Sequence, residues 1–134
     1  MRKENWPRLI TDEIKKLQNT PFVWGKKDCC LAVGDIIEAY TGEDLAAEFR
    51  GKYTTASGSV RALKRYGQGT IRATMDAKLP SILIEEAGRG DIGLVKTEAG
   101  ESLAMIFSQQ AWAMAEHGIE ALPMTDLVCA WRIE

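Results

Sequence analysis

The sequence is poor in the residues that metal and redox sites require. It has one His and three Cys among 134 residues, and the Cys form no CxxC pair. A single imidazole excludes multi-His zinc sites of the HExxH kind. The GxxxxGK[ST] phosphate loop and the GxSxG nucleophile elbow are also missing. We therefore expect no metal and no cofactor, and any Cys–His chemistry depends on one imidazole.

Long hydrophobic runs and an excess of one charge are missing as well. Runs such as Leu103 to Phe107 are far shorter than the ~20 apolar residues that span a bilayer, and no apolar stretch follows the charged start. The 17 Lys and Arg nearly balance the 19 Asp and Glu, for a net charge of −2. An odd number of Cys, two of them adjacent, is typical of free thiols in a reducing compartment. We expect a cytoplasmic protein without membrane insertion or nucleic-acid binding.

The apolar content is sufficient for one hydrophobic core. Apolar residues make up 46% of the chain, and its length favours a single domain over residues 1–134. Near the start, apolar residues recur at helical spacing and Pro7 suits a first turn. This spacing predicts a helix over about residues 6–18, with its apolar face formed by Trp6, Leu9, Ile10, Ile14 and Leu17.

The segment from Cys29 to Tyr40 differs from an amphipathic surface helix. It carries only two charged residues, Asp35 and Glu38, and is apolar on nearly every side. Asp28 is a good N-cap residue for it, and Gly42 is a good terminator. The pattern indicates the buried central helix of the domain.

The rest of the chain changes from helical to strand-like patterns. Residues 43–57 are expected to be irregular, and short helices are expected around 60–66, ended by Gly67, and over about 70–78. After Gly90-Asp91, short apolar runs separated by turn residues predict strands over 92–97, 102–107, 111–115 and 127–133. We expect an α+β fold, with N-terminal helices packed on a C-terminal antiparallel sheet or half-barrel.

The start of the predicted buried helix is the main candidate for chemistry. A thiol in a first helical turn faces unpaired backbone N–H groups and the positive end of the helix dipole, which favour the thiolate. Lys26 and Lys27 are expected to add to this effect. Cys29 is therefore a candidate nucleophile. In the alternative interpretation, Cys29 and Cys30 are small apolar core residues.

A series of short motifs resembles a known family. In chain order they are Phe22-Val23-Trp24-Gly25, Asp28-Cys29, Tyr40-Thr41-Gly42-Glu43-Asp44, Gly51-Lys52-Tyr53, Gly90-Asp91 and Ala130-Trp131-Arg132. Their order is similar to that of NlpC-type cell-wall cysteine peptidases in the papain-like superfamily. It resembles most a branch encoded in bacteriophages and prophages near tail-assembly genes. The resemblance covers about residues 5–134 and implies a papain-like (NlpC-like) fold with the nucleophile at Cys29.

The sequence departs from these peptidases at the catalytic His. The family keeps it at the start of the strand that follows the Gly-Asp strand, where this chain has Ser102. A general acid/base contributes ~10²–10⁴-fold to such a reaction, and a serine hydroxyl cannot supply it. His117 is the only substitute base, with Glu116 able to orient its ring. The alternative interpretation of His117 is a surface residue in a turn after a strand.

Three other patterns received structural interpretations. The positive charge of Lys52, Arg61, Lys64, Arg65 and Arg72 is interpreted as a solvated helix face. The four Trp are expected to fill a core. Asp91 is either a second carboxylate of the site or simply part of the Gly-Asp turn.

Two functions follow from these features. The first is a structural or tail-assembly module that has lost the Cys–His pair and binds phage tail proteins or cell-wall peptide. Such a protein is made in the cytoplasm and carried into a phage particle. The alternative is a thiol hydrolase that cleaves peptide or amide bonds of cell-wall peptides through Cys29. The missing His favours the first, whereas Asp28-Cys29 at a helix start favours the second.

Overall fold

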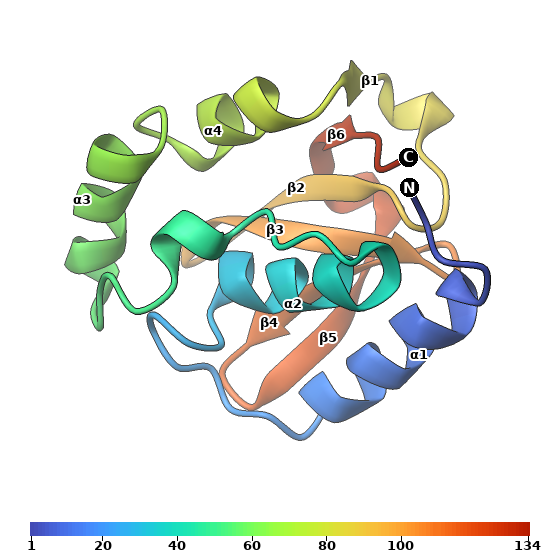
Figure 1. Ribbon diagram of the computed structural model, residues 1–134, viewed down its shortest axis with the longest axis horizontal. Helices are drawn as coiled ribbons and strands as arrows, with labels where there is room; N and C mark the ends of the chain where they lie inside the picture. Colours follow the sequence, from blue (N-terminus) through green and yellow to red (C-terminus); the bar gives the residue numbers. More distant parts are fainter.

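The structure, a computed structural model, describes residues 1–134. Its helices are α1 (Trp6–Leu17), α2 (Cys29–Thr41), α3 (Ala56–Tyr66) and α4 (Ile71–Lys78). Its strands are β1 (Ser81–Ile82), β2 (Ile92–Thr97), β3 (Gly100–Phe107), β4 (Gln110–Ala115), β5 (Gly118–Pro123) and β6 (Leu127–Trp131). The 3₁₀ helices are η1 (Ala47–Phe49), η2 (Ile84–Glu86) and η3 (Met124–Asp126). The predicted α+β fold, with the α-helices before the sheet, is confirmed (Figure 1).

Helix α1 forms where the sequence predicted a helix over about residues 6–18. Pro7 lies in the first turn, where its missing N–H removes no intrahelical hydrogen bond. Ile10, Ile14 and Leu17 are buried along one side of the helix. Because these residues recur every three or four positions, α1 packs a single apolar face against α2 and the sheet.

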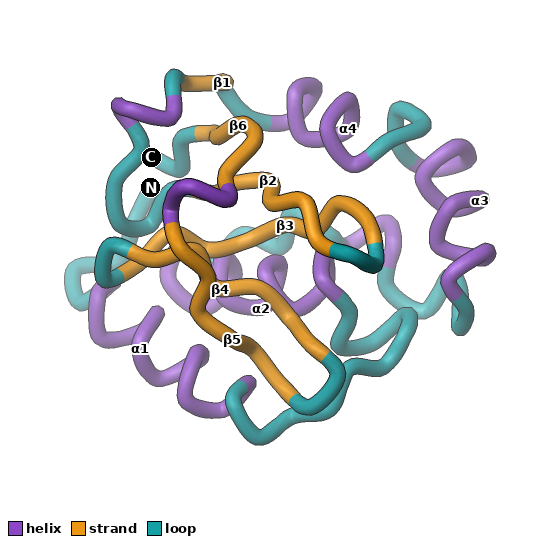
Figure 2. The backbone as a smooth tube through the Cα atoms, turned by 180° about the vertical axis from the view of Figure 1, so that it is seen from behind, coloured by secondary structure: helices purple, strands orange, loops and turns teal.

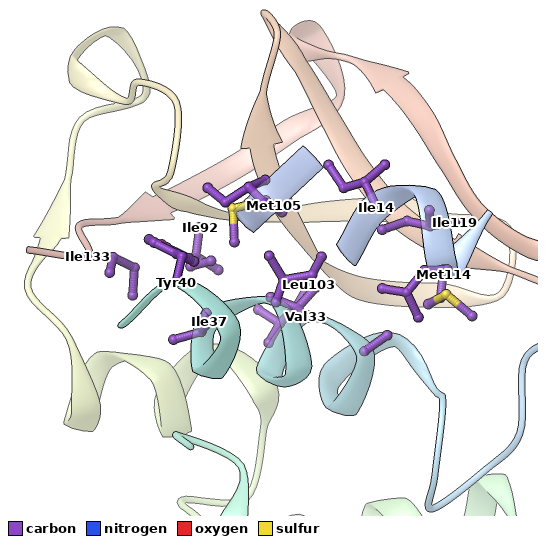
Figure 3. Close-up of a cluster of buried hydrophobic side chains, with 14 of the residues drawn as sticks. Ile14, Val33, Ile37, Tyr40, Ile92, Leu103, Met105, Met114, Ile119 and Ile133 are labelled. Carbon is purple, nitrogen blue, oxygen red and sulfur yellow. The ribbon is translucent and has the colours of Figure 1, made fainter. Parts of the chain in front are cut away.

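Helix α2 is the buried central helix that the sequence predicted. Seven of its thirteen residues are buried, and Gly42 ends it in the left-handed conformation at φ +86°. Figure 3 shows Val33, Ile37 and Tyr40 pointing from α2 into the apolar cluster that the sheet completes. The other labelled side chains of that cluster are Ile14, Ile92, Leu103, Met105, Met114, Ile119 and Ile133. Burial on several sides is the reason why α2 has so few charged residues.

The sheet has six strands in the order β1-β6-β2-β3-β4-β5, and all neighbours are antiparallel. Helices α1 and α2 cover one face, and Figure 2 shows the sheet from its other side. Strand β3 alternates between the two faces: Leu103 and Met105 join the large core, whereas Ala104 and Ile106 join a smaller cluster. This alternation is the period-2 pattern from which the strands were predicted.

The predicted strands are confirmed, and two further strands were missed. Strand β1 has only two residues, which is too short for a periodic signal. Strand β5 lies at the sheet edge and ends at Pro123. Because proline is tolerated at edges but disrupts central strands, its presence weakens the strand signal of residues 118–123.

The two termini meet at Asp91, in the turn before β2 (Figure 1). Asp91 is 3% exposed and pairs with Arg2 at 3.2 Å, while the Ile133 N–H donates to its carboxylate at 3.3 Å. Arg2 also donates to the Ile133 carbonyl at 2.8 Å. Close by, the Tyr40 hydroxyl donates to the Gly90 carbonyl. These contacts assign Asp91 to the Gly-Asp turn rather than to a second carboxylate at the thiol. None of the helices is both long enough and apolar enough to cross a bilayer.

Candidate functional site

The segment before α2 is fixed by the carboxylate of Asp28, which is 1% exposed. Its Oδ1 accepts hydrogen bonds from the N–H groups of Cys30 at 3.1 Å and Leu31 at 3.0 Å, which makes it the N-cap of α2. Its Oδ2 accepts from the Gly25 N–H at 3.0 Å and from the Tyr53 hydroxyl. One side chain therefore holds both the helix start and the loop that leads into it.

Cys29 is the first residue of α2, and its thiol lies 3.7 Å from that of Cys30, measured between the two Sγ atoms. The hydrogen bond from Cys30 is the main cause that lowers the pKa of Cys29. Burial and the Asp28 charge oppose it, while Ser102 and the Leu103 backbone lower the pKa further. The pKa of Cys30 is raised, because its bond to Cys29 and its burial both favour the neutral thiol. Cys29 is thus the member of the pair that carries thiolate character.

Ser102, on strand β3, occupies the side of the thiol that faces the sheet. Ser102 is 6% exposed, its side chain lowers the pKa of Cys29, and its hydroxyl donates to the Leu103 carbonyl at 3.2 Å. The structure therefore brings together Cys29, Asp28 and Ser102. A buried hydroxyl at this point can donate a hydrogen bond to a thiolate, but it has no proton equilibrium near neutral pH with which to act as a base.

His117 lies in the turn between β4 and β5 rather than among these groups. Its side chain is 90% exposed, and its Nε2 lies 3.9 Å from the Glu116 carboxylate. The turn is held to the middle of the α1–α2 connection, where the Phe22 N–H donates to the Glu116 carbonyl at 3.0 Å. The groups that act on the pKa of Cys29 include neither His117 nor Glu116.

The lysines before α2 do not act on the thiol as the sequence suggested. Lys27 Nζ lies 2.6 Å from Asp35, a carboxylate in the second turn of α2, and Lys26 is exposed. Arg50 pairs with the same Asp35 at 2.9 Å. Because α2 provides this acceptor, Lys27 is directed along α2 instead of toward Cys29.

Tyr53 is the residue of the site that the sequence did not single out. It appeared only as part of the Gly51-Lys52-Tyr53 motif, 25 positions from the Asp28 carboxylate that it contacts. Burial and the hydrogen bond to Asp28 hold the pKa of Tyr53 well above its usual value. No local spacing signals such a contact, because the loop of residues 50–55 reaches α2 only in the folded chain.

Behind the thiols lies a small apolar cavity of about 50 Å³. It separates α2 from η1, α3 and α4, and its lining includes Cys30, Val33, Phe49, Met75 and Leu103. No three His, Cys, Asp or Glu side chains come together in a way that would hold a metal ion. The site consists of a capped helix start, a thiol pair and a buried hydroxyl.

Solved structures of NlpC/p60 domains share this arrangement of helices and sheet. The NlpC/p60 domain of the peptidoglycan hydrolase SagA has a TM-score of 0.62 and 17% identity, over 95% of this chain and 98% of that one. A Staphylococcus aureus subsp. aureus Mu50 protein of the NLP/P60 family, SAV0400, similar to a lipoprotein, has a TM-score of 0.61 and 16% identity. That match covers 98% of this chain and 42% of the Staphylococcus chain.

A third similar structure is RipD from Mycobacterium tuberculosis, described as a non-catalytic NlpC/p60 domain protein adapted to peptidoglycan binding. Its TM-score is 0.51 at 15% identity, over 98% of this chain and 100% of RipD. The chain thus has the papain-like NlpC/p60 fold, as the sequence resemblance implied. The chain belongs to the DUF6950 family, whose model matches residues 1–133 and is described as a domain of unknown function. No curated protein matches it.

Proposed function

We propose that the protein is a non-hydrolytic NlpC/p60-type module that works by binding, as a structural or assembly component of a phage tail. One observation carries this proposal: the β3 side chain that acts on the Cys29 thiol is the hydroxyl of Ser102 and not an imidazole. Peptide cleavage by a thiol needs a group that protonates the leaving amine, and a serine hydroxyl does not perform that step. The site therefore lacks a means to cleave a peptide.

Two further observations support a binding role. RipD has the same fold and is described as non-catalytic and adapted to peptidoglycan binding. The ordered motifs resemble the phage and prophage branch, which supports a place in a tail. In this proposal residues 1–134 act as one domain, which is made in the cytoplasm and incorporated into the particle. Its partners are tail proteins or cell-wall peptides.

Hydrolysis assays with peptidoglycan fragments test the proposal. The full chain and the Cys29→Ser variant are incubated with the fragments, and newly released amino groups are quantified. We expect no release above the buffer level from either protein. Co-purification with tail proteins encoded beside it, or sedimentation with peptidoglycan, is expected for both proteins, because Cys29→Ser changes only one atom of the site.

Cys129→Ser is the matched control, because Cys129 is a free thiol on β6 away from the start of α2. Amine release by the unmodified chain that persists in Cys129→Ser and disappears in Cys29→Ser would overturn the binding proposal. Failure to associate with either tail proteins or peptidoglycan would overturn it as well.

The alternative function, a thiol hydrolase, is favoured by the lowered pKa of Cys29 at the α2 start. In that case His117 is the only imidazole that can serve as base, and the β4–β5 turn has to bring it to the thiol. The same assay decides between the two, because cleavage abolished by both Cys29→Ser and His117→Ala supports the hydrolase.

A further inference from the structure

Positive charge is concentrated in one part of this slightly acidic chain. From Phe49 to Met75 the sequence contains six Lys and Arg and no Asp or Glu, while the whole chain has a net charge of −2. This segment forms the loop before α3, α3 itself and the start of α4. In Figure 1 the green helix α3 lies at the side of the molecule, and α4 continues from it to contact β3.

Four of the six cations line a single groove of about 660 Å³: Lys52, Arg61, Lys64 and Arg65. All four are exposed. None of these four cations forms an ion pair with a carboxylate. The neighbouring Arg50, by contrast, pairs with Asp35 and Asp44. Four like charges without counter-charges repel one another, and an anion in the groove relieves that repulsion.

The groove has the chemistry and the size for several anionic groups. Its remaining lining is Tyr53, Thr54, Thr55, Gly58, Ala62 and Tyr66, so hydroxyl groups accompany the cations. Arg and Lys with hydroxyl donors suit the three acceptor oxygens and the charge of a phosphate group. A volume of about 660 Å³ is in the range of pockets for extended ligands rather than for a single small ion.

Both tyrosine rings in the groove already make contacts: Tyr66 with two of the cations, and Tyr53 through its hydroxyl with Asp28. Lys52 Nζ lies 5.5 Å and Arg65 Cζ 5.4 Å from the centroid of the Tyr66 ring, and the Phe49 ring packs at 6.5 Å with near-perpendicular planes. Proteins that bind single-stranded nucleic acid depend on aromatic faces on which bases stack. Because the Tyr66 ring contacts two of the cations and the Tyr53 hydroxyl is bonded to the buried Asp28, the groove favours a phosphate chain without bases.

We infer that the groove between the 52–55 loop and α3 binds a linear, base-free chain of phosphate groups through Lys52, Arg61, Lys64 and Arg65. Its lining includes neither Cys29 nor Ser102. The inference therefore goes beyond the proposed function, and it stands or falls independently of what happens at the thiol.

Calorimetric titration of the full chain with inorganic tripolyphosphate tests the inference. We expect saturable binding that weakens between 25 and 200 mM NaCl, because phosphate contacts release counterions. The variant Lys52→Gln/Lys64→Gln removes two groove charges and is expected to bind roughly tenfold more weakly. The matched control, Lys15→Gln/Lys96→Gln, removes two exposed lysines on α1 and β2 that form no ion pair, and is expected to bind as the unmodified chain does.

Other ligands and outcomes complete the experiment. Equal weakening in both double variants would show attraction by overall charge and overturn the inference, as would no binding by the unmodified chain. Tighter binding of a single-stranded oligonucleotide of equal charge would show a nucleic-acid site instead. Equal binding of a glutamate-rich peptide would show that phosphate is not recognised. Preference for tripolyphosphate, lost only in the groove variant, supports the inference.

Discussion

At the residue scale, the thiol of Cys29 lies among hydrogen-bond donors and lacks a neighbouring base. Cys30, Ser102 and the Leu103 backbone lower its pKa against the opposing effects of burial and Asp28. A lowered pKa makes a thiol reactive toward electrophiles, but it does not complete a hydrolytic cycle, because the proton for the leaving group has no source. Reactivity and catalysis are therefore separable at this residue, and each can be measured.

The hydroxyl of Ser102 is expected to control the reactivity of Cys29. Ser102→Ala removes one donor to the thiolate, which raises the pKa of Cys29 and moves its alkylation profile to higher pH. In a Cys129→Ser background, we expect several-fold slower alkylation by iodoacetamide near neutral pH, with mass spectrometry of the modified peptide as the measurement. Cys30→Ala removes the main donor and is expected to have the larger effect.

Thr97→Ala serves as the control for Ser102→Ala. It also removes a hydroxyl from the sheet, but that hydroxyl donates to the Gly100 carbonyl in the β2–β3 hairpin. Its alkylation profile is expected to match that of the parent. A Ser102→Ala profile that does not move, or that moves to lower pH, would show that Ser102 does not stabilise the thiolate.

At the element scale, the loop before α2 depends on a close backbone approach. Gly25 is buried, has φ +81°, and donates its N–H to Asp28. A Cβ on Gly25 would lie 1.9 Å from the Tyr53 carbonyl oxygen, which is main chain and cannot rotate away. The loop therefore packs against residue 53 only because position 25 has no side chain.

A paired substitution separates this contact from the cost of the left-handed backbone. Gly51 has a similar φ of +72° and nothing within 4 Å of its would-be Cβ. We expect Gly51→Ala to lower the free energy of unfolding by about 1 kcal/mol from backbone strain alone. Gly25→Ala is expected to cost about 3 kcal/mol or more, because a steric overlap is added.

Urea unfolding of both variants is the measurement. An equal decrease in the free energy of unfolding for Gly25→Ala and Gly51→Ala would show that the backbone around residue 53 moves away from the new Cβ at no cost. In the expected case, Gly25→Ala also loosens the Tyr53–Asp28 contact, and alkylation of Cys29 reports that change independently.

At the scale of the whole molecule, α2 is joined to the turn where the two termini meet. Tyr40 is 0% exposed, and its hydroxyl donates to the Gly90 carbonyl, next to the Asp91 that binds Arg2. Burial raises the pKa of Tyr40 well above its usual value; the Asp91 charge adds to the shift and Arg2 opposes it. The central helix thus contributes to holding both ends of the chain.

This shift predicts a loss of stability in alkali. A raised pKa in the folded state means that Tyr40 stabilises the fold fully below its unfolded pKa near 10, and that this contribution declines as the pH rises further. At pH 11 the unfolded tyrosine is largely ionised, and the loss is about 1.4 kcal/mol. Tyr40→Phe is expected to be less stable at pH 9 but to lose about 1.4 kcal/mol less between pH 9 and pH 11.

Urea unfolding under reducing conditions at the two pH values measures this difference. Ile36→Val is the control, since it creates a defect in the same buried helix without removing a titrating group. It is expected to keep the pH dependence of the unmodified chain. The same pH dependence in Tyr40→Phe would show that Tyr40 does not couple ionisation to folding.

Local patterns in the sequence determined most of the elements. The spacing of Ile10, Ile14 and Leu17 predicted α1, and the scarcity of charge between Asp28 and Gly42 predicted a buried α2 with its cap and terminator. Such features depend on neighbours a few positions away, which is the range over which helix and strand periodicity operate. The edge strand β5 escaped prediction because an edge position tolerates residues that a central strand does not.

The sequence by itself determined that only one imidazole exists and that Cys29 begins a buried helix. Only the tertiary structure decided what surrounds that thiol, placing Ser102 beside it and the Tyr53 hydroxyl on its cap. It likewise gathered into one groove cations that the sequence had assigned to a solvated helix face. The physical reason is that these contacts join residues far apart along the chain, and their geometry is set by packing of the whole fold rather than by local spacing.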